Sequence, residues 1–102
     1  MEKEIVLSII RQHTAELKAA GVMKLSLFGS VARGEATHES DVDVVIRLED
    51  AIMKSGFGYF GAMENVRLKL EEIIGRPVDV ISEPIEKERL AREIERDRQV
   101  AF

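Results

Sequence analysis

The spacing of apolar residues along the chain predicts four helices and three strands. Apolar side chains recur every three or four residues in the helical segments, which is the spacing of one buried stripe, and largely alternate with polar ones in the strands. The predicted helices span residues 3–20, 30–33, 60–74 and 84–98, and the predicted strands span residues 24–28, 41–48 and 78–81. This order indicates an α/β chain with a three-stranded sheet and helices packed mainly on one face.

The predicted strand over residues 41–48 has two clearly different faces. One face is wholly apolar and needs a cover of helices: Val42, Val44, Ile46 and Leu48. The other begins with Asp41 and Asp43, whose Cα atoms would lie roughly 6.6 Å apart with both side chains on one side. At an effective dielectric constant near 20, two such carboxylates repel by roughly 2.5 kcal/mol. A bound divalent cation would reverse the sign of this interaction.

Two other regions leave alternatives open. Residues 49–61 contain three glycines and most of the aromatic residues, and we interpret this segment as a flexible connector. Its aromatic residues either stack on a base, contact a partner or pack the loop onto the core: Phe57, Tyr59 and Phe60. Val100 and Phe102 either pack back onto the chain or contact another chain.

Composition limits the kind of protein further. With 102 residues and 45% apolar content, residues 1–102 suit one compact domain. The net charge of -4 disfavours direct binding to nucleic acid or to an anionic membrane. The chain contains no cysteine, which excludes disulfides and thiolate sites. No apolar run reaches the roughly 18 residues that a membrane span needs, so we expect a soluble, cytoplasmic protein.

A phosphate-binding corner precedes the two carboxylates in the sequence. Gly29 allows close approach of the backbone to a ligand, and Ser30 would present N–H groups and a hydroxyl to a phosphate. Asp79, on the predicted strand over residues 78–81, would join Asp41 and Asp43 as oxygen ligands of magnesium ions. Two ions about 3.5–4 Å apart would clamp the attacking and leaving oxygens of a phosphoryl displacement.

The order of these residues resembles the signature of a known family. The pattern is Gly29-Ser30-x-Ala32-Arg33-Gly34, five further residues, and then Ser40-Asp41-x-Asp43. It is similar at every position to the signature of the DNA polymerase beta-like nucleotidyltransferase superfamily, and the short chain resembles its minimal nucleotidyltransferase (MNT) branch. The resemblance implies a small mixed sheet of three or more strands, and transfer of a nucleoside monophosphate from a nucleoside triphosphate to a hydroxyl.

The resemblance also implies roles for individual residues. Gly29 and Ser30 would hold the triphosphate, and Asp41 and Asp43 would bind both metal ions. Asp79 would be the third carboxylate, a ligand of the catalytic metal and the general base toward the acceptor. Glu83 and Asp50 are alternatives for this third position. Arg33 either binds a phosphate or anchors the short helix through a salt bridge.

The MNT branch further implies a partner. Its stand-alone members are commonly antitoxins of HEPN toxins. Such an antitoxin transfers AMP from ATP to a tyrosine of its toxin. We therefore expect a magnesium-dependent adenylyltransferase with two Mg²⁺ ions, ATP as substrate and a helical HEPN toxin as partner, in a homo- or hetero-oligomer. The alternatives are an antitoxin that acts by binding alone and a nucleotidyltransferase of the antibiotic-modifying kind.

Overall fold

A four-stranded sheet with the strand order β3-β2-β1-β4 forms the centre of the molecule. The computed structural model describes residues 2–102. Its strands are β1 (Val22–Phe28), β2 (Val42–Leu48), β3 (Val78–Ser82) and β4 (Gln99–Val100). Strand β1 is antiparallel to both β2 and β4, whereas β2 and β3 are parallel. The prediction of a small mixed sheet is confirmed.

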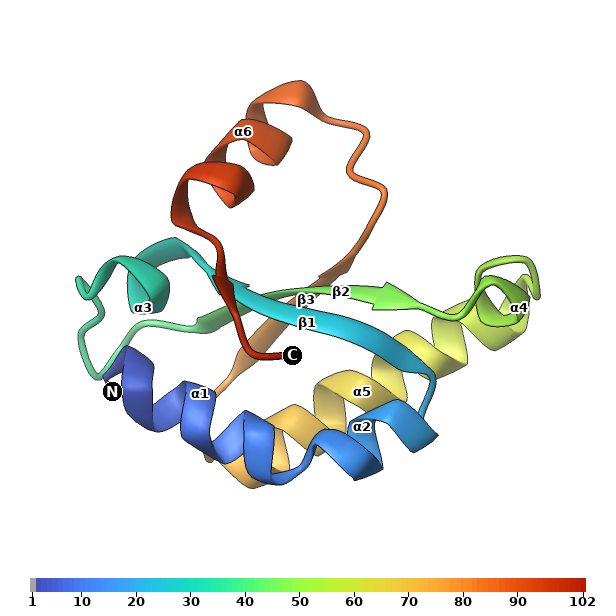
Figure 1. The fold of residues 1–102 in the computed structure, drawn as a ribbon, viewed down its shortest axis with the longest axis horizontal. Helices are drawn as coiled ribbons and strands as arrows, with labels where there is room; N and C mark the ends of the chain where they lie inside the picture. Colours follow the sequence, from blue (N-terminus) through green and yellow to red (C-terminus); the bar gives the residue numbers. More distant parts are fainter. Residues whose placement is uncertain (1) are drawn as a thin grey trace.

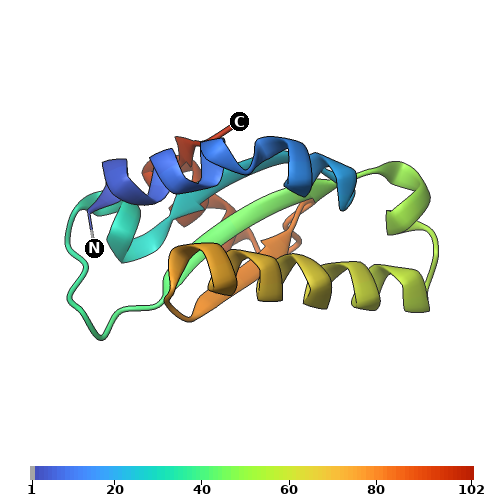
Figure 2. The same ribbon diagram turned by 90° about the horizontal axis from the view of Figure 1, so that it is seen from below.

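Three helices cover one face of this sheet. They are α1 (Lys3–Gln12), α2 (Thr14–Ala19) and α5 (Phe57–Ile74). Figure 1 shows them beneath the strands, and Figure 2, seen from below, shows α1 and α2 running beside α5. The apolar side of β2 faces them and is fully buried, as its pattern predicted: Val42, Val44, Ile46 and Leu48. Burial of four such side chains contributes roughly 1.5–3 kcal/mol each. This layer is the main core.

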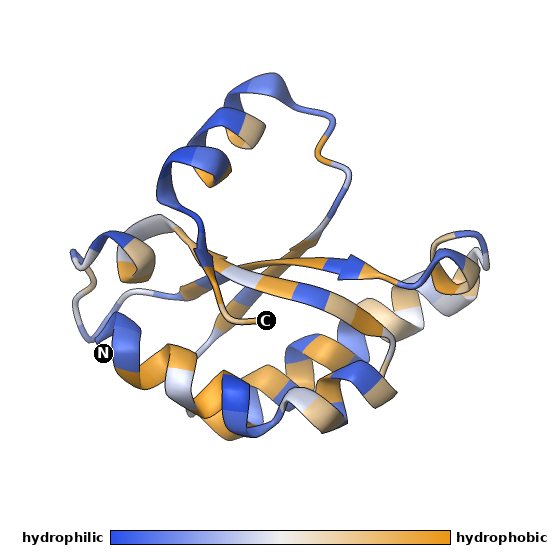
Figure 3. Cartoon of the chain, in the orientation of Figure 1, coloured by the Kyte–Doolittle hydropathy of each residue, from blue (hydrophilic) through white to orange (hydrophobic). Residues whose placement is uncertain are grey.

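The opposite face of the sheet is covered by one helix, α6 (Glu88–Asp97), shown above the strands in Figure 1. Figure 3 shows that α6 is hydrophilic over most of its length. One side chain of α6, Ile94, is nevertheless buried. Val45 of β2, which points to this face of the sheet, is buried as well. The helices therefore lie mainly on one face, and the polar face of β2 is only partly covered.

Two predicted segments differ from the structure. The helix predicted over residues 3–20 is interrupted at His13, which is half-buried and lies with Nδ1 2.9 Å from the Ile9 carbonyl oxygen. The flexible connector predicted over residues 49–61 is wrong, because it holds α4 (Asp50–Met53) and the first turns of α5. The glycine content misled this prediction. Tyr59 packs against the core and its hydroxyl hydrogen-bonds the Ser82 hydroxyl, which offsets the cost of about 1 kcal/mol for each helical glycine.

The end of the described chain packs back onto the sheet. The helix predicted over residues 84–98 begins later, at Glu88, and residues 99–100 then form β4, a strand that the short apolar pattern did not predict. The Ala101 N–H donates to the Leu25 carbonyl at 2.9 Å, and Arg11 Nε donates to the Ala101 carbonyl at 2.9 Å. Phe102 packs against the core, whereas the Val100 side chain is 56% exposed on β4, so contact of Val100 with another chain stays a prediction.

Candidate active site

The polar face of the sheet brings the predicted carboxylates together. In the parallel register Asp43 of β2 is paired with Asp79 of β3, and Phe28 of β1 lies opposite Asp43 on the other side. Paired residues of neighbouring strands point to the same face. Asp41 lies two residues before Asp43, immediately outside β2. Three carboxylates from two strands thus share one end of the face that α6 leaves open.

Asp43 is the carboxylate most affected by this arrangement. It is half-buried, while Asp41 and Asp79 are exposed. Burial, together with the negative charges of Asp79 and Asp41, raises the pKa of Asp43 from 3.8 to about 6, and the Arg33 charge acts in the opposite direction. These side chains are therefore close enough to influence one titration, and at neutral pH the carboxylates repel one another.

Gly29 lies against Asp43. It begins the short helix α3 (Gly29–Arg33) directly after β1 and has a φ of +73°. A Cβ atom at this position would overlap Oδ2 of Asp43. From the sequence we expected a ligand to come close to the Gly29 backbone, and in the structure the Asp43 carboxylate does so. Any side chain at residue 29 would displace this carboxylate.

Asp41, Asp43 and Asp79 are suitable ligands for a magnesium ion that is also bound by the phosphates of a nucleoside triphosphate. Within residues 2–102, no three Asp, Glu, His or Cys side chains are already gathered as a cation site. Magnesium, however, is usually held by one or two carboxylates together with substrate phosphates and water. The neighbouring Asp43 and Asp79, with Asp41 beside them, supply hard oxygen ligands of this kind. Their role as metal ligands remains a prediction.

The alternatives for the third carboxylate lie elsewhere. Asp50 begins α4, at the far end of the sheet from α3 (Figure 1). Glu83 is paired with Arg98, whose Nη2 lies 3.3 Å from its Oε2. Asp79, in contrast, sits directly beside Asp43 in the strand register. The structure therefore brings Asp79 to the site and places neither alternative there.

Arg33 makes ion pairs within the chain. Its Nε donates to Glu35 Oε2 at 3.0 Å and its Nη1 to Asp97 Oδ2 at 2.8 Å. This is the anchoring salt bridge that the sequence left as one of two alternatives, and phosphate binding by Arg33 stays a prediction. Ser30, half-buried in α3, likewise remains a predicted phosphate ligand.

Asp97 was missed in the sequence. The last helix is densely charged, yet this carboxylate is buried at the end of α6. One signal was available, because Asp97 continues the helical spacing of Leu90 and Ile94 on the buried stripe. A charge on an apolar stripe indicates either a partner cation or a site.

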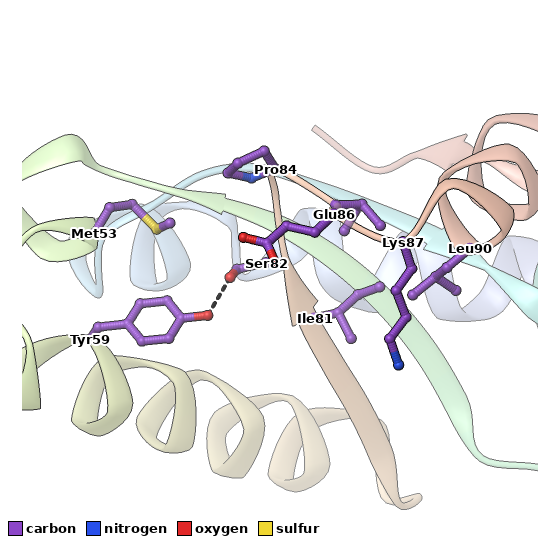
Figure 4. Close-up of a pocket in the computed structure, with 9 residues that line it drawn as sticks. Met53, Tyr59, Ile81, Ser82, Pro84, Glu86, Lys87 and Leu90 are labelled. Atoms are coloured by element: carbon purple, nitrogen blue, oxygen red, sulfur yellow. Dashed lines mark hydrogen bonds between the residues drawn. The ribbon is translucent and has the colours of Figure 1, made fainter.

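A groove of about 420 Å³ opens along the carboxyl end of β3, and none of the predicted site residues is among those that line it. Its lining comes from α4, α5, β3 and the segment leading into α6: Met53, Tyr59, Ile81, Ser82, Pro84, Ile85, Glu86, Lys87 and Leu90. Figure 4 shows Met53 and Tyr59 across Ser82 from Ile81, Lys87 and Leu90. Ile81 follows Asp79 by two residues, so both lie on one face of this edge strand. The groove therefore begins two residues further along β3 than Asp79, the predicted general base.

The mixed sheet, the Gly29 corner and the carboxylates on two parallel strands are the arrangement expected of a nucleotidyltransferase. The model of the nucleotidyltransferase domain family matches residues 7–101. The chain belongs to this family, and the prediction that it is a nucleotidyltransferase enzyme is confirmed.

Curated relatives and a solved structure point to the minimal branch. Protein adenylyltransferase MntA of Thermococcus cleftensis is 32% identical over 97 residues, 92% of this chain and 90% of its own. MJ1379 of Methanocaldococcus jannaschii, provisionally named a protein adenylyltransferase, is 39% identical over 75 residues, 72% of this chain and 71% of its own. A structure described as a minimal nucleotidyltransferase is 31% identical, with a TM-score of 0.71, and the match covers 97% of this chain and 95% of that one. The resemblance to MNT proteins is confirmed.

A more distant structure shares the fold. It contains a tri-AMPylated Shewanella oneidensis HEPN toxin in complex with an MNT antitoxin. The matched chain is 14% identical, with a TM-score of 0.62, and the match covers 94% of this chain and 71% of that one. At this identity the likeness concerns the fold alone.

The raised pKa of Asp43 predicts how stability depends on pH without divalent cations. Well below pH 3.8 the carboxyl is protonated in both the folded and the unfolded chain, so it does not lower the stability of the fold. As the pH rises to about 6 the unfolded chain ionises first, and stability falls. We expect Asp43→Asn to raise the free energy of unfolding by about 1–3 kcal/mol at pH 8 and by little at pH 4. Urea unfolding in EDTA measures this, with Glu72→Gln, an exposed carboxylate of α5, as the control. Equal effects at both pH values would contradict the electrostatic explanation.

Proposed function

We propose that the chain transfers AMP from ATP to a protein hydroxyl, a tyrosine of a HEPN-type toxin, and acts as the antitoxin of that partner. The observation that carries this proposal is the parallel register that places Asp43 beside Asp79, with the Gly29 backbone against Asp43. The names of the relatives support protein adenylylation, and the MNT–HEPN complex of the same fold supports a HEPN partner. The reaction belongs in the cytoplasm, where ATP is available. Within residues 2–102 there is no helix with the length and apolarity to cross a membrane.

The proposed reaction is an in-line displacement at the α-phosphorus of ATP. Gly29, Ser30 and Arg33 hold the triphosphate, and Asp41, Asp43 and Asp79 hold two magnesium ions. The acceptor oxygen forms a bond to the α-phosphorus, the bond to the oxygen bridging to the β-phosphate breaks, and pyrophosphate leaves. Asp79 accepts the proton of the acceptor hydroxyl. Magnesium, when bound, neutralises charge on the triphosphate and on the leaving group.

We propose that the acceptor comes from the outer side of β3. This strand is the edge of the sheet, so a second polypeptide can approach Asp79 there. The groove along β3 lies on the same side, and Phe57 and Phe60 of α5 are 94% and 70% exposed next to Tyr59, which lines it. In this proposal residues 1–102 act as one minimal domain, and the partner completes the acceptor side.

The proposal is tested by incubating the folded protein with magnesium, ATP labelled at the α-phosphate and a helical HEPN-type protein as the partner. We expect label on the partner, and mass spectrometry should place an AMP group on a tyrosine. A parallel screen with small hydroxylated acceptors covers the antibiotic-modifying alternative. Absence of label on the partner, with both proteins folded and in complex, would exclude the proposed function.

A further inference from the structure

Asp97 is a buried charge that the proposed reaction does not use. Ser26 and Asp97 are the polar residues that the structure buries between residues 2 and 102, and Asp97 is 5% exposed. A carboxylate is retained in such a position only when cations neutralise it. Asp97 Oδ2 accepts from Arg33 Nη1 at 2.8 Å, and Asp97 Oδ1 accepts from Arg96 Nε at 2.9 Å. These arginines keep the carboxylate charged and lower the pKa of Asp97 to about 2.

The ion pair between Arg33 and Asp97 connects the helices α3 and α6. Arg33 is the last residue of α3, the helix that begins at Gly29 against Asp43. Its partner in the ion pair, Asp97, is the last residue of α6. Arg33 follows Gly29 by four residues, so both lie on the same face of α3, about one helical turn apart. The ion pair of Arg33 with Asp97 therefore links the end of α3 to the end of α6.

The Arg33 guanidinium is only partly occupied. Its Nε donates to Glu35 and its Nη1 to Asp97, whereas within residues 2–102 its Nη2 makes no hydrogen bond. The Arg33 side chain is 37% exposed, so a ligand can reach it. Glu35 is itself 63% exposed, and exposed ion pairs contribute little, whereas the Asp97 side chain is 3% exposed. Asp97 is thus the contact that orients the arginine.

We propose that Asp97 is a positioning residue of the nucleotide site, which holds Arg33 and α3 beside Asp43 so that Arg33 Nη2 binds a phosphate of the nucleoside triphosphate. This inference rests on the proposed function. The planar guanidinium suits it, because its Nε and Nη1 pair with Glu35 and Asp97 while Nη2 remains to donate to the phosphate.

The test measures binding of AMP-PNP with magnesium by calorimetry in the full chain. We expect Asp97→Asn and Arg33→Gln each to weaken binding roughly tenfold, since each removes one oriented charged contact. The double variant should bind no more weakly than Arg33→Gln. Arg96→Gln is the matched control, because it also removes a cation from Asp97 but keeps the pair with Arg33; its affinity should stay within about twofold. Removing a negative charge would by itself tighten the binding of an anion. Weaker binding of AMP-PNP by Asp97→Asn would therefore show that Arg33 has lost its orientation.

Thermal melts of every variant separate folding from binding. If Asp97→Asn does not fold, Arg33→Lys tests the same geometry, because a lysine ammonium keeps the charge but lacks the fork of donors. Its affinity should fall by a similar factor, and an unchanged affinity would overturn the inference. Equal effects of Asp97→Asn and Arg96→Gln, or a further loss by Asp97→Asn when Arg33 is already replaced, would overturn the inference alone. Failure of the unmodified chain to bind AMP-PNP would overturn both the inference and the proposed function.

Discussion

Replacing both Asp41 and Asp43 by alanine is expected to slow AMP transfer by roughly 10³-fold or more while the protein remains folded. A single contact that stabilises the transition state is commonly worth 10²–10³ in rate, and in the proposed site these two carboxylates hold the ions that neutralise the leaving pyrophosphate. Asp43 also carries an electrostatic penalty at neutral pH, since its pKa is raised to about 6. The double variant should therefore be at least as stable as the unmodified protein. Transfer of labelled AMP to the partner, measured beside Glu72→Gln, checks the rate, and urea unfolding checks the fold.

The same variant separates catalysis from neutralisation by binding. When the toxin is expressed with the double variant, we expect growth inhibition to return, because the toxin is no longer modified. If transfer is lost but neutralisation persists, the partner is silenced by complex formation instead. If transfer itself persists, Asp41 and Asp43 are not the metal ligands, and the assignment of the site is wrong.

Gly29→Ala is expected to reduce transfer by roughly 10²-fold and to lower stability by more than the backbone cost alone. The left-handed conformation at φ +73° costs a residue with a Cβ atom about 1–2 kcal/mol. In addition, the new methyl group overlaps Asp43 Oδ2 and must displace that carboxylate. Gly34 offers a matched control, since its φ is +74° but a Cβ there meets no atom within 4 Å. Gly34→Ala should lose similar backbone stability and keep its transfer rate.

A double-mutant cycle tests the cause of the Gly29 effect. Asp43→Ala removes Oδ2 and Cγ, the two nearest atoms that the new methyl group would meet, and keeps Cβ. Gly29→Ala should therefore cost less stability in that background than in the unmodified chain. Equal costs in the two backgrounds, or equal loss of transfer in Gly29→Ala and Gly34→Ala, would show that contact with Asp43 is not the reason for the glycine.

Much of the site could be read from local pattern. Alternation along residues 41–48 placed Asp41 and Asp43 on one face and the apolar residues on the other, because side-chain direction in a strand repeats every two residues whatever the strand packs against. The Gly29-Ser30 corner was evident for a similar reason, since it ends one predicted strand and starts a short helix. The segment over residues 49–61 misled us because glycine propensity is a weak local preference that packing of Tyr59 overrides.

Contacts between distant segments depended on the assembled fold. The pairing of Asp79 with Asp43, the approach of Gly29 to Asp43 and the ion pair of Arg33 with Asp97 join residues that are 14 to 64 positions apart. Their formation depends on strand register and on the packing of α6 across the sheet, and neither is encoded in the periodicity of one segment. Local alternation and turn residues thus identified the groups that carry the chemistry, and only the tertiary structure decided which of them meet, because meeting requires long-range packing.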